Sequence, residues 1–365
     1  MKILTVVGAR PNFIKVAPLH HAFCRYPHVR SKIVHTGQHH APKMSDIFIR
    51  QLGLPLPDYT LGINQGPPTQ LTASIMLAFE RILLHENPNQ VVVVGDVTST
   101  LACALAAAQT QVPVAHVEAG LRSFDRSMPE ELNRIMTDAI ADMHFVSEYS
   151  GIVNLKHEGI PTPKIHWVGN VMIDTLVRHK NNIDQSRILS RYNLNPQQYA
   201  LVTVHRPANV DYRGRLLQLT QIILKTADHL NVIFPVHPRT QNNLKKFGLL
   251  PLLTTHPKVI LAEPLGYFDF VKLMKNAKLV ITDSGGVQEE TTYLGIPCFT
   301  LRQNTERPVT IEIGTNQLIP DLSPESVSDA LENVMHGREK KGKIPPLWDG
   351  KTASRIATIL IEGSH

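Results

Sequence analysis

The stretch that decides the fold runs from Lys278 to Glu290 and reads K-L-V-I-T-D-S-G-G-V-Q-E-E. Its apolar start, Leu279 to Ile281, has the length and β-branching of a buried strand, and the pattern from Val287 predicts a helix that ends near Gly295. Two glycines between a strand and a helix N-terminus let the backbone approach a ligand, and the helix end favours an anion such as phosphate. The same residues are equally typical of a capped turn without a ligand. The stretch therefore predicts a strand–turn–helix unit and leaves its ligand open.

Short β-rich runs alternate with helical patterns along the rest of the chain. The predicted strands are Ile3–Val7, Val91–Val94, Val114–Val117, His144–Val146, Leu201–Val204, Val232–Val236, Val259–Leu261, Leu279–Thr282 and Cys298–Leu301. This order is typical of parallel sheets with right-handed crossovers, so it predicts an α/β fold. Nine strands favour two sheets, with a boundary near Gly169. We expect an N-terminal domain of residues 1–169, onto which a helix at 350–362 packs back, and a C-terminal domain of residues 170–349.

Composition narrows the class of protein. The 365 residues are 42% hydrophobic and 19% charged, which is ordinary for a globular chain with two cores. A net charge of +6 suits an anionic ligand, but no Lys/Arg run with interleaved aromatics indicates nucleic acid. The three cysteines are scattered among apolar neighbours and are typical of reduced core thiols in a cytoplasmic protein. No apolar run has the length of a membrane span, so we expect no membrane partner.

Charged residues and histidines collect where the predicted parallel strands end. In open α/β sheets that edge is where ligands bind. The candidate cations are Arg10, Lys15, Arg206 and Arg307, the candidate carboxylates are Asp96, Glu118, Glu130 and Glu290, and His205 can donate or accept a proton near neutral pH. Cations stabilise a phosphate leaving group, and crowded carboxylates serve as acids and bases. The residue types therefore predict acid/base chemistry on a phosphate-bearing substrate.

Several of these residues also have a purely structural interpretation. Pro129 and Glu130 form a good helix start, and Asp96 could equally cap a helix. Lys15 fits a solvated helix face, and Phe270 fits a hydrophobic core. The chain has no G-x-G-x-x-G after a strand, no phosphate-binding loop of the G-x-x-x-x-G-K type and no metal-ligand spacing. We therefore expect no nicotinamide cofactor and no metal.

Taken in order, the strand-end motifs resemble those of one enzyme family. The motifs are G-A-R-P-N-F-I-K-V-A-P-L (Gly8–Leu19), T-G-Q-H (Thr36–His39), G-D-V-T-S-T (Gly95–Thr100), V-E-A-G-L-R-S (Val117–Ser123), P-E-E-L-N-R (Pro129–Arg134), V-H-R (Val204–Arg206), D-S-G-G-V-Q-E-E (Asp283–Glu290) and T-E-R-P (Thr305–Pro308). Together they are similar to the non-hydrolysing UDP-N-acetylglucosamine 2-epimerases, from Lys2 to about Gly314. The resemblance implies an isomerase with two Rossmann-like domains facing a cleft, in the glycosyltransferase-B-type fold, with UDP in that cleft and a homodimeric assembly.

The resemblance also implies a mechanism. UDP leaves as the proton on carbon 2 is removed, which gives a 2-acetamidoglucal, and UDP then adds back with protonation from the other face. The resemblance assigns catalytic roles to Asp96, Glu118, Glu130, His205 and Lys15. It assigns the diphosphate to Arg10, Ser284, Gly285 and Gly286, the ribose to Glu290, the uracil to Phe270 and nucleotide support to Arg307. It does not decide which carboxylate takes the proton.

Two segments depart from the family pattern. Where the family reads Q-H-R-E-M-L, this chain has Gln38–Met44, which puts activation by a second UDP-sugar in doubt. Ala208 replaces an acid after the His-Arg motif, and this change could retune the choice of sugar. The alternatives are therefore a relative acting on another UDP-2-acetamido sugar, such as a diacetamido uronate, and a hydrolysing variant that releases N-acetylmannosamine and UDP. A nucleotide-sugar sensor without catalysis is disfavoured by the intact carboxylate and histidine set.

Overall fold

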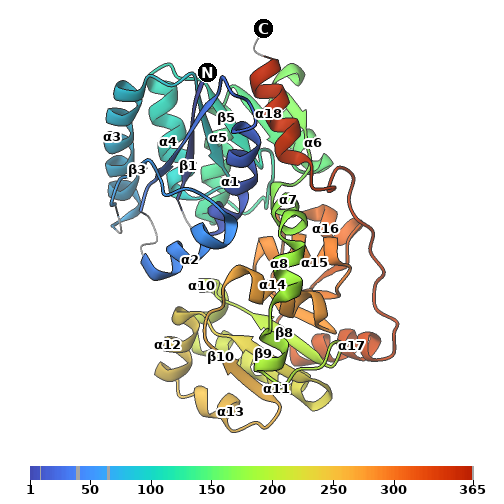
Figure 1. The fold of residues 1–365 in the computed structure, drawn as a ribbon. Coiled ribbons are helices and arrows are strands. Elements are labelled where there is room, and N and C mark those ends of the chain that lie inside the picture. Colours follow the sequence, from blue (N-terminus) through green and yellow to red (C-terminus); the bar gives the residue numbers. More distant parts are fainter. Residues whose placement is uncertain (9, 38–41, 64–65, 364–365) are drawn as a thin grey trace. The chain divides into compact units, whose positions relative to one another are not determined.

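The computed structural model describes residues 1–8, 10–37, 42–63 and 66–363, with the backbone alone for residues 10–11 and 42–46. The chain divides into two compact units (Figure 1). Unit 1 comprises residues 1–178 and 346–365, and unit 2 comprises residues 179–345. The helix that follows Gly169 therefore lies in unit 1, so the division falls one helix later than the sequence boundary.

Unit 1 is built on a parallel sheet of seven strands. The strands are β1 (Lys2–Val7), β2 (Arg30–His35), β3 (Tyr59–Thr60), β4 (Gln90–Val94), β5 (Val114–Val117), β6 (Met143–Val146) and β7 (Ile165–Trp167). Their order across the sheet is β3-β2-β1-β4-β5-β6-β7, and every described pairing is parallel. The direction of travel through the sheet reverses between β1 and β4, which is the position where open α/β sheets bind ligands.

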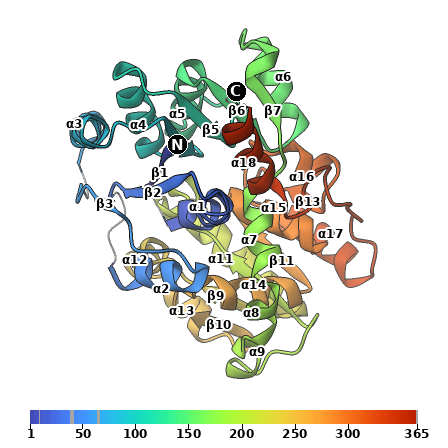
Figure 2. The same ribbon diagram turned by 45° about the horizontal axis from the view of Figure 1, so that its top comes forward.

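Helices cover both faces of this sheet. They are α1 (Arg10–Phe23), α2 (Pro42–Leu52), α3 (Pro68–Glu86), α4 (Thr98–Gln109), α5 (Pro129–Ile140), α6 (Tyr149–His157), α7 (Val171–Arg178) and α18 (Thr352–Glu362), with a short 3₁₀ turn at Thr162–Lys164. Helices α3, α4 and α5 pack side by side on one face, while α1, α7 and α18 pack together on the other (Figure 2). The C-terminal helix α18 is therefore part of unit 1, although the chain reaches it only after the whole of unit 2.

Unit 2 repeats the same topology with a parallel sheet of six strands. The strands are β8 (Tyr199–Thr203), β9 (Asn231–Pro235), β10 (Val259–Ala262), β11 (Leu279–Thr282), β12 (Cys298–Thr300) and β13 (Asn316–Leu318). The helices are α8 (Lys180–Gln185), α9 (Ile188–Arg191), α10 (Pro207–Val210), α11 (Arg213–His229), α12 (Pro238–Lys246), α13 (Leu250–Thr254), α14 (Tyr267–Asn276), α15 (Gly285–Leu294), α16 (Pro308–Glu312) and α17 (Pro324–Met335). The strand order is β10-β9-β8-β11-β12-β13, so here the reversal lies between β8 and β11.

The prediction of an α/β fold with two parallel sheets is confirmed. All nine predicted strands are present, and the sequence missed four more, β2, β3, β7 and β13. Three of the four lie at sheet edges and are two or three residues long, so they are too short to give an apolar run. The fourth, β2, is partly exposed at its start and reads R-S-K-I-V-H, which dilutes the apolar signal.

Apolar packing accounts for most of each core. Strands β4 and β11 are wholly buried, as expected for parallel strands with helices on both faces.

None of the helices in the described part of the chain combines the length and apolar character that a membrane crossing requires.

Candidate functional site

The carboxyl ends of β4 and β5 in unit 1 bring two of the predicted carboxylates to one edge of the sheet. Asp96 follows β4 by two residues, and Glu118 directly follows β5, which is the hydrogen-bonded neighbour of β4. Glu118 has a φ of +69°, a left-handed conformation that is uncommon for a residue with a side chain. Such backbone strain persists where the surroundings enforce it, and it is frequent at functional sites.

Glu118 is held by a lysine from the neighbouring helix. The Nζ atom of Lys15, on α1, lies 2.5 Å from Oε2 of Glu118, and both side chains are buried. The other carboxylate oxygen, Oε1, is buried and has no hydrogen-bond partner among the described residues. A buried carboxylate oxygen without a donor is costly, so this atom is open to a donor that the described residues do not supply.

Helix α5 supports the turn that carries Asp96. Asn133 donates a hydrogen bond from Nδ2 to the carbonyl oxygen of Asp96 at 2.9 Å, and the fully buried Arg134 forms an ion pair with its carboxylate. Glu130 lies one helical turn before Arg134, so it shares a face with that arginine. The Glu130 side chain is partly exposed and makes no hydrogen bond to the residues that the structure describes.

The predicted anion site of unit 2 lies at the N-terminus of α15, directly after β11. Ser284 occupies the N-cap position, but its side chain does not accept a hydrogen bond from the helix. The guanidinium of Arg307 lies against Gly285, because a Cβ added there would be only 2.5 Å from Nη1. Glycine at this position therefore lets a cation and a helix N-terminus converge, and both favour an anion.

Carboxylates hold the arginines of this edge in place. Glu306 is buried and accepts from Nη1 and Nη2 of Arg302 at 2.9 and 2.8 Å. Its oxygens also lie 3.3 Å from Nη1 of Arg307 and 3.8 Å from Nη2 of Arg206. Burial alone would raise the pKa of Glu306, but the three guanidinium groups bring it well below the ordinary value. Glu289 holds Arg307 from its other side, accepting from Nε at 2.7 Å.

Asp283 connects this edge to the end of β8. Its buried carboxylate accepts from the backbone N–H groups of His205 and Arg206, at 3.1 and 2.8 Å, and from Nδ2 of Asn209 at 3.0 Å. The Nδ1 atom of His205 lies 3.3 Å from the same carboxylate. The imidazole of His205 is otherwise largely open, with 43% of the side chain exposed. Asp283 therefore orients a histidine that remains accessible.

Glu290 is a buried acid with a raised pKa. It is 3% exposed, and the hydroxyl of Tyr267 donates to its Oε1 at 2.8 Å. Burial raises the pKa of Glu290, the hydrogen bond from Tyr267 opposes the rise and the charge of Glu289 adds to it, which together bring the pKa to about 7. Phe270, one helical turn after Tyr267 on α14, is partly exposed and packs on the apolar cluster beneath.

The structure brings together Lys15, Glu118 and Asp96 in unit 1, and Ser284, Gly285, Arg307 and His205 in unit 2. Arg10 begins α1, but its side chain lies outside the described residues, as does most of the departing segment 38–44. Sequence reasoning missed the supporting residues Arg134, Asp283 and Glu306 as members of the site. All three lie inside the quoted motifs, so their closeness in sequence to a candidate residue could have identified them.

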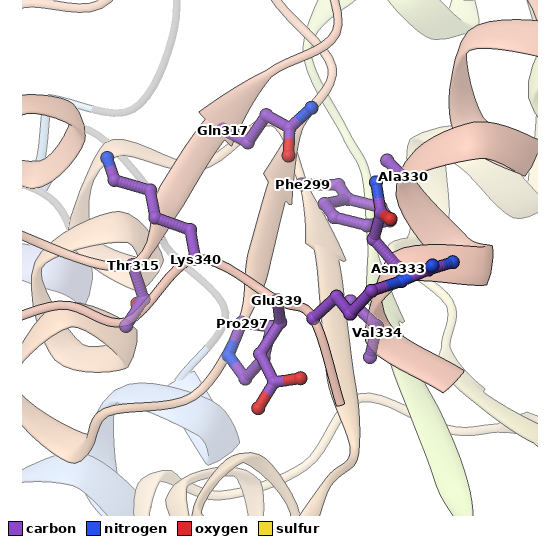
Figure 3. A pocket seen from close by; sticks show the side chains of 10 residues that line it. Pro297, Phe299, Thr315, Gln317, Ala330, Asn333, Val334, Glu339 and Lys340 are labelled. Carbon is purple, nitrogen blue, oxygen red and sulfur yellow. The ribbon is translucent and has the colours of Figure 1, made fainter. Parts of the chain in front are cut away.

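A cavity of about 240 Å³ lies elsewhere in unit 2 (Figure 3). Pro297 and Thr315 line it, and they directly precede β12 and β13. The side chain of Lys340, also in the lining, donates to the carbonyl oxygens of Ile311 and Asn316. The cavity therefore opens at the amino ends of the strands, away from the edge that carries Ser284.

Comparison with known proteins identifies the family. The model of the UDP-N-acetylglucosamine 2-epimerase family matches residues 21–361. This chain belongs to that family. The UDP-N-acetylglucosamine 2-epimerase of Methanocaldococcus jannaschii is 40% identical over 370 residues and covers 100% of both chains. The UDP-2,3-diacetamido-2,3-dideoxy-D-glucuronate 2-epimerase of Pseudomonas aeruginosa is 39% identical over 364 residues, or 99% of each chain.

Solved structures of the family have the same fold. The M. jannaschii enzyme in complex with UDP-GlcNAc and UDP matches with a TM-score of 0.93 at 40% identity, over 100% of both chains. The Neisseria meningitidis UDP-GlcNAc 2-epimerase bound to UDP-GlcNAc matches with a TM-score of 0.90 at 28% identity, over 99% of this chain and 100% of that one. The predicted resemblance is confirmed, and the protein is an epimerase, hence an isomerase.

Proposed function

We propose that the protein inverts carbon 2 of a UDP-2-acetamido sugar, with UDP-N-acetylglucosamine as the first substrate to test. The observation that carries this proposal is the Glu118 carboxylate, which is buried, held through Oε2 by Lys15 and, among the described residues, without a hydrogen-bond donor at Oε1. A protein that only bound a nucleotide sugar would not need a strained, buried carboxylate beside a second one, Asp96. Family membership supports the same reaction.

The proposed reaction begins with elimination. A carboxylate of unit 1 takes the proton from carbon 2, and the carbon 1–oxygen bond breaks with its electron pair moving to UDP, which leaves a double bond between carbons 1 and 2. We assign Glu118 as the first candidate for this base, with Asp96 and Glu130 as the other acid/base groups and Lys15 and His205 as supporting charges. Re-addition of UDP with protonation on the opposite face completes the inversion. The proton beside an acetamido group is weakly acidic, so stabilising the departing UDP is the larger task.

We propose that unit 2 performs that task. Ser284, Gly285 and Gly286 present the N-terminus of α15 to the diphosphate, and Arg307 adds a guanidinium. Arg10 of unit 1 is assigned to the same diphosphate. Glu290 is the ribose acceptor and Phe270 the surface for uracil.

The test is UDP-N-acetylglucosamine in deuterated water, followed by proton NMR. Epimerisation gives UDP-N-acetylmannosamine with deuterium at carbon 2, whereas hydrolysis gives free N-acetylmannosamine and UDP. The diacetamido uronate substrate named for the P. aeruginosa relative is assayed in parallel, because that relative is almost as similar as the M. jannaschii enzyme. Absence of carbon-2 exchange with both sugars would refute the proposed reaction.

We also propose a homodimer that uses the outer face of α3 and α5 in unit 1. Leu77 and Leu84, two turns apart on α3, are 63% and 72% exposed, and Met136 on α5 is 44% exposed. Large apolar side chains left exposed on helices of one sheet face favour burial against a second copy. Leu84→Glu should convert the dimer to a monomer in light scattering, whereas Leu56→Glu, at a 75% exposed leucine outside these helices, should not. A wild-type monomer, or a dimer indifferent to Leu84→Glu, contradicts this assembly.

We propose a cytoplasmic location. Its support is that Cys24, Cys103 and Cys298 form no disulfide in the described part of the chain, and free thiols are typical of a reducing compartment. Fractionation of cells that express a tagged full-length chain tests this, and recovery from an extracytoplasmic fraction contradicts it.

A further inference from the structure

A buried charged cluster lies directly behind the carboxylate edge of unit 1. Its members are His116 on β5 and Asp138 on α5, which are both fully buried, and the buried Arg122, which also pairs with Glu158 at the surface. None of these four residues has a role in the reaction proposed above. Burying charged groups is costly unless they are paired, so the cluster needs an explanation beyond packing.

The hydrogen bonds of His116 fix its protonation state. Its Nδ1 atom lies 2.6 Å from Oδ1 of Asp138, and its Nε2 atom lies 2.8 Å from the carbonyl oxygen of Gly95. A carbonyl oxygen can only accept, so Nε2 carries a proton. If Asp138 is ionised, Nδ1 must carry a proton as well, and His116 is then an imidazolium.

The surroundings of Asp138 show that it is ionised. Its Oδ2 atom accepts from the backbone N–H of Gly120 at 3.0 Å and lies 2.7 Å from Nη2 of Arg122. Burial would raise the pKa of Asp138, but opposite charges outweigh it and lower the pKa, and among them the charge of Arg122 does not depend on the protonation of His116. Arg122 is shared with Glu158. His144 lies 2.7 Å through Nε2 from the backbone carbonyl oxygen of Asp138, and 3.3 Å through Nδ1 from that of Lys164.

The pair connects the two turns that carry the proposed catalytic acids. Through His116, Asp138 holds the carbonyl of Gly95, which has a φ of +74° and directly precedes Asp96. Through its own Oδ2 it holds the N–H of Gly120, which has a φ of +77° and lies two residues after Glu118. A side chain at Gly120 is excluded, since a Cβ there would lie 2.4 Å from the carbonyl oxygen of Gly151.

We propose that Asp138 and His116 are positioning residues, and that the hydrogen bonds of this pair set the relative placement of the Asp96 and Glu118 turns. This inference rests on the proposed epimerase function. Neither side chain touches the substrate; they act through the backbone groups that they hold. Their loss should therefore lower kcat and leave UDP binding nearly unchanged, because neither residue belongs to the groups assigned to UDP.

The first measurement uses the wild-type protein with ¹⁵N-labelled histidine. Because both ring nitrogens face acceptor oxygens, His116 should show protons on both of them, assigned by loss of the signals in His116→Asn. A single ring proton on His116 overturns the proposal. This spectrum is independent of catalysis, so it is unaffected if the proposed reaction fails.

The second measurement compares two variants of Asp138. In Asp138→Ala both held turns are released, and kcat should fall about 100-fold with KM within about threefold, the cost of a small misplacement of catalytic groups. In Asp138→Asn the amide can donate to Nδ1 of a neutral His116, which keeps its bond to Gly95, so kcat should stay within about fivefold of wild type. The His116 spectrum should then show one ring proton.

Melting curves and UDP affinity accompany each variant. A folded Asp138→Ala with wild-type kcat contradicts the positioning role, and so does a folded Asp138→Asn whose kcat falls as far as that of Asp138→Ala. If Asp138→Ala does not fold, His116→Gln replaces it, and wild-type kcat in that variant is equally contradictory. If the wild-type enzyme shows no exchange at carbon 2, the proposed function is refuted instead. Failure of the positioning role and failure of the proposed function are therefore distinguishable.

Discussion

The functional edges of both units are built on ion pairs between a carboxylate and a cation, but the two partners exchange roles between the units. In unit 1 cations hold carboxylates: Lys15 holds Glu118, and Arg134 holds Asp96. In unit 2 carboxylates hold cations: Glu306 and Glu289 fix Arg307 beside the N-terminus of α15. Both edges lie where the strand order of a parallel sheet reverses or beside that point, so topology alone does not distinguish them. The difference teaches that one fold supplies acid/base groups or an anion clamp according to whether a cation orients a carboxylate or a carboxylate orients a cation.

The largest expected effect comes from removing the open carboxylate of unit 1. Glu118→Gln keeps the shape of the side chain but not its basicity, so carbon-2 exchange should fall about 1,000-fold. UDP affinity, measured by calorimetry, should change less than about twofold, because the clamp lies in unit 2. Glu332→Gln, at an exposed acid on α17, is the matched control and should behave as wild type. Normal exchange in Glu118→Gln would remove Glu118 from the catalytic set.

The anion clamp of unit 2 can be disturbed by one methyl group. In Gly285→Ala the new Cβ would lie 2.5 Å from Nη1 of Arg307, so the guanidinium must move away from the helix end. Displacing a charge-assisted contact of this kind should weaken UDP binding by about tenfold or more. Gly214→Ala is the matched control, since nothing lies within 4 Å of a Cβ there. Equal UDP affinities for the two variants would show that Arg307 does not contact the nucleotide.

Much of this comparison could be predicted from the sequence, but the pairing could not. The strands β4, β5, β8 and β11 were evident as apolar runs, and the residues that follow them were correctly expected at one edge of each sheet. The partner of each charge was not evident, because Lys15 and Glu118 are 103 residues apart. Arg134 looked like an ordinary helix residue, and only the fold shows that it is fully buried against Asp96. Local pattern predicts where polar groups emerge, whereas long-range packing decides which of them are neutralised.

The pH dependence of UDP affinity tests the role proposed for Glu290 in unit 2. Its pKa of about 7 means that the free protein protonates this acid as the pH falls below neutrality. If the ionised form is the ribose acceptor, UDP affinity should fall by about tenfold for each pH unit below 7. Glu290→Gln should remove that dependence while the titration of UDP itself remains common to both proteins. A wild-type profile that parallels Glu290→Gln would separate Glu290 from nucleotide binding.

The same shift has a consequence for stability, with a definite sign. The folded pKa of Glu290 lies above its ordinary value of 4.5, so its contribution is fully present below pH 4.5 and is lost as the pH rises through about 7. Relative to Glu290→Gln, the wild type should therefore lose up to about 3 kcal/mol of unfolding free energy between pH 4.5 and 8. Urea unfolding of both proteins across this range measures it. A constant difference between them would show that Glu290 titrates normally.

The smallest effect is expected from Asp174, a buried carboxylate of unit 1 with both oxygens satisfied. It accepts from the backbone N–H groups of Thr352 and Ala353, at 3.1 and 2.7 Å, and so caps the start of α18. Burial raises the pKa of Asp174, and the two N–H bonds oppose that rise. Asp174→Asn should cost about 1 kcal/mol, the usual range for a lost cap, with carbon-2 exchange unchanged below the melting temperature. The test contrasts Asp174 with Glu118, since both acids are buried in unit 1. Only Glu118, whose Oε1 has no hydrogen-bond donor among the described residues, should matter for turnover. A loss of kcat in folded Asp174→Asn would show that the unpartnered oxygen is not what distinguishes the two acids.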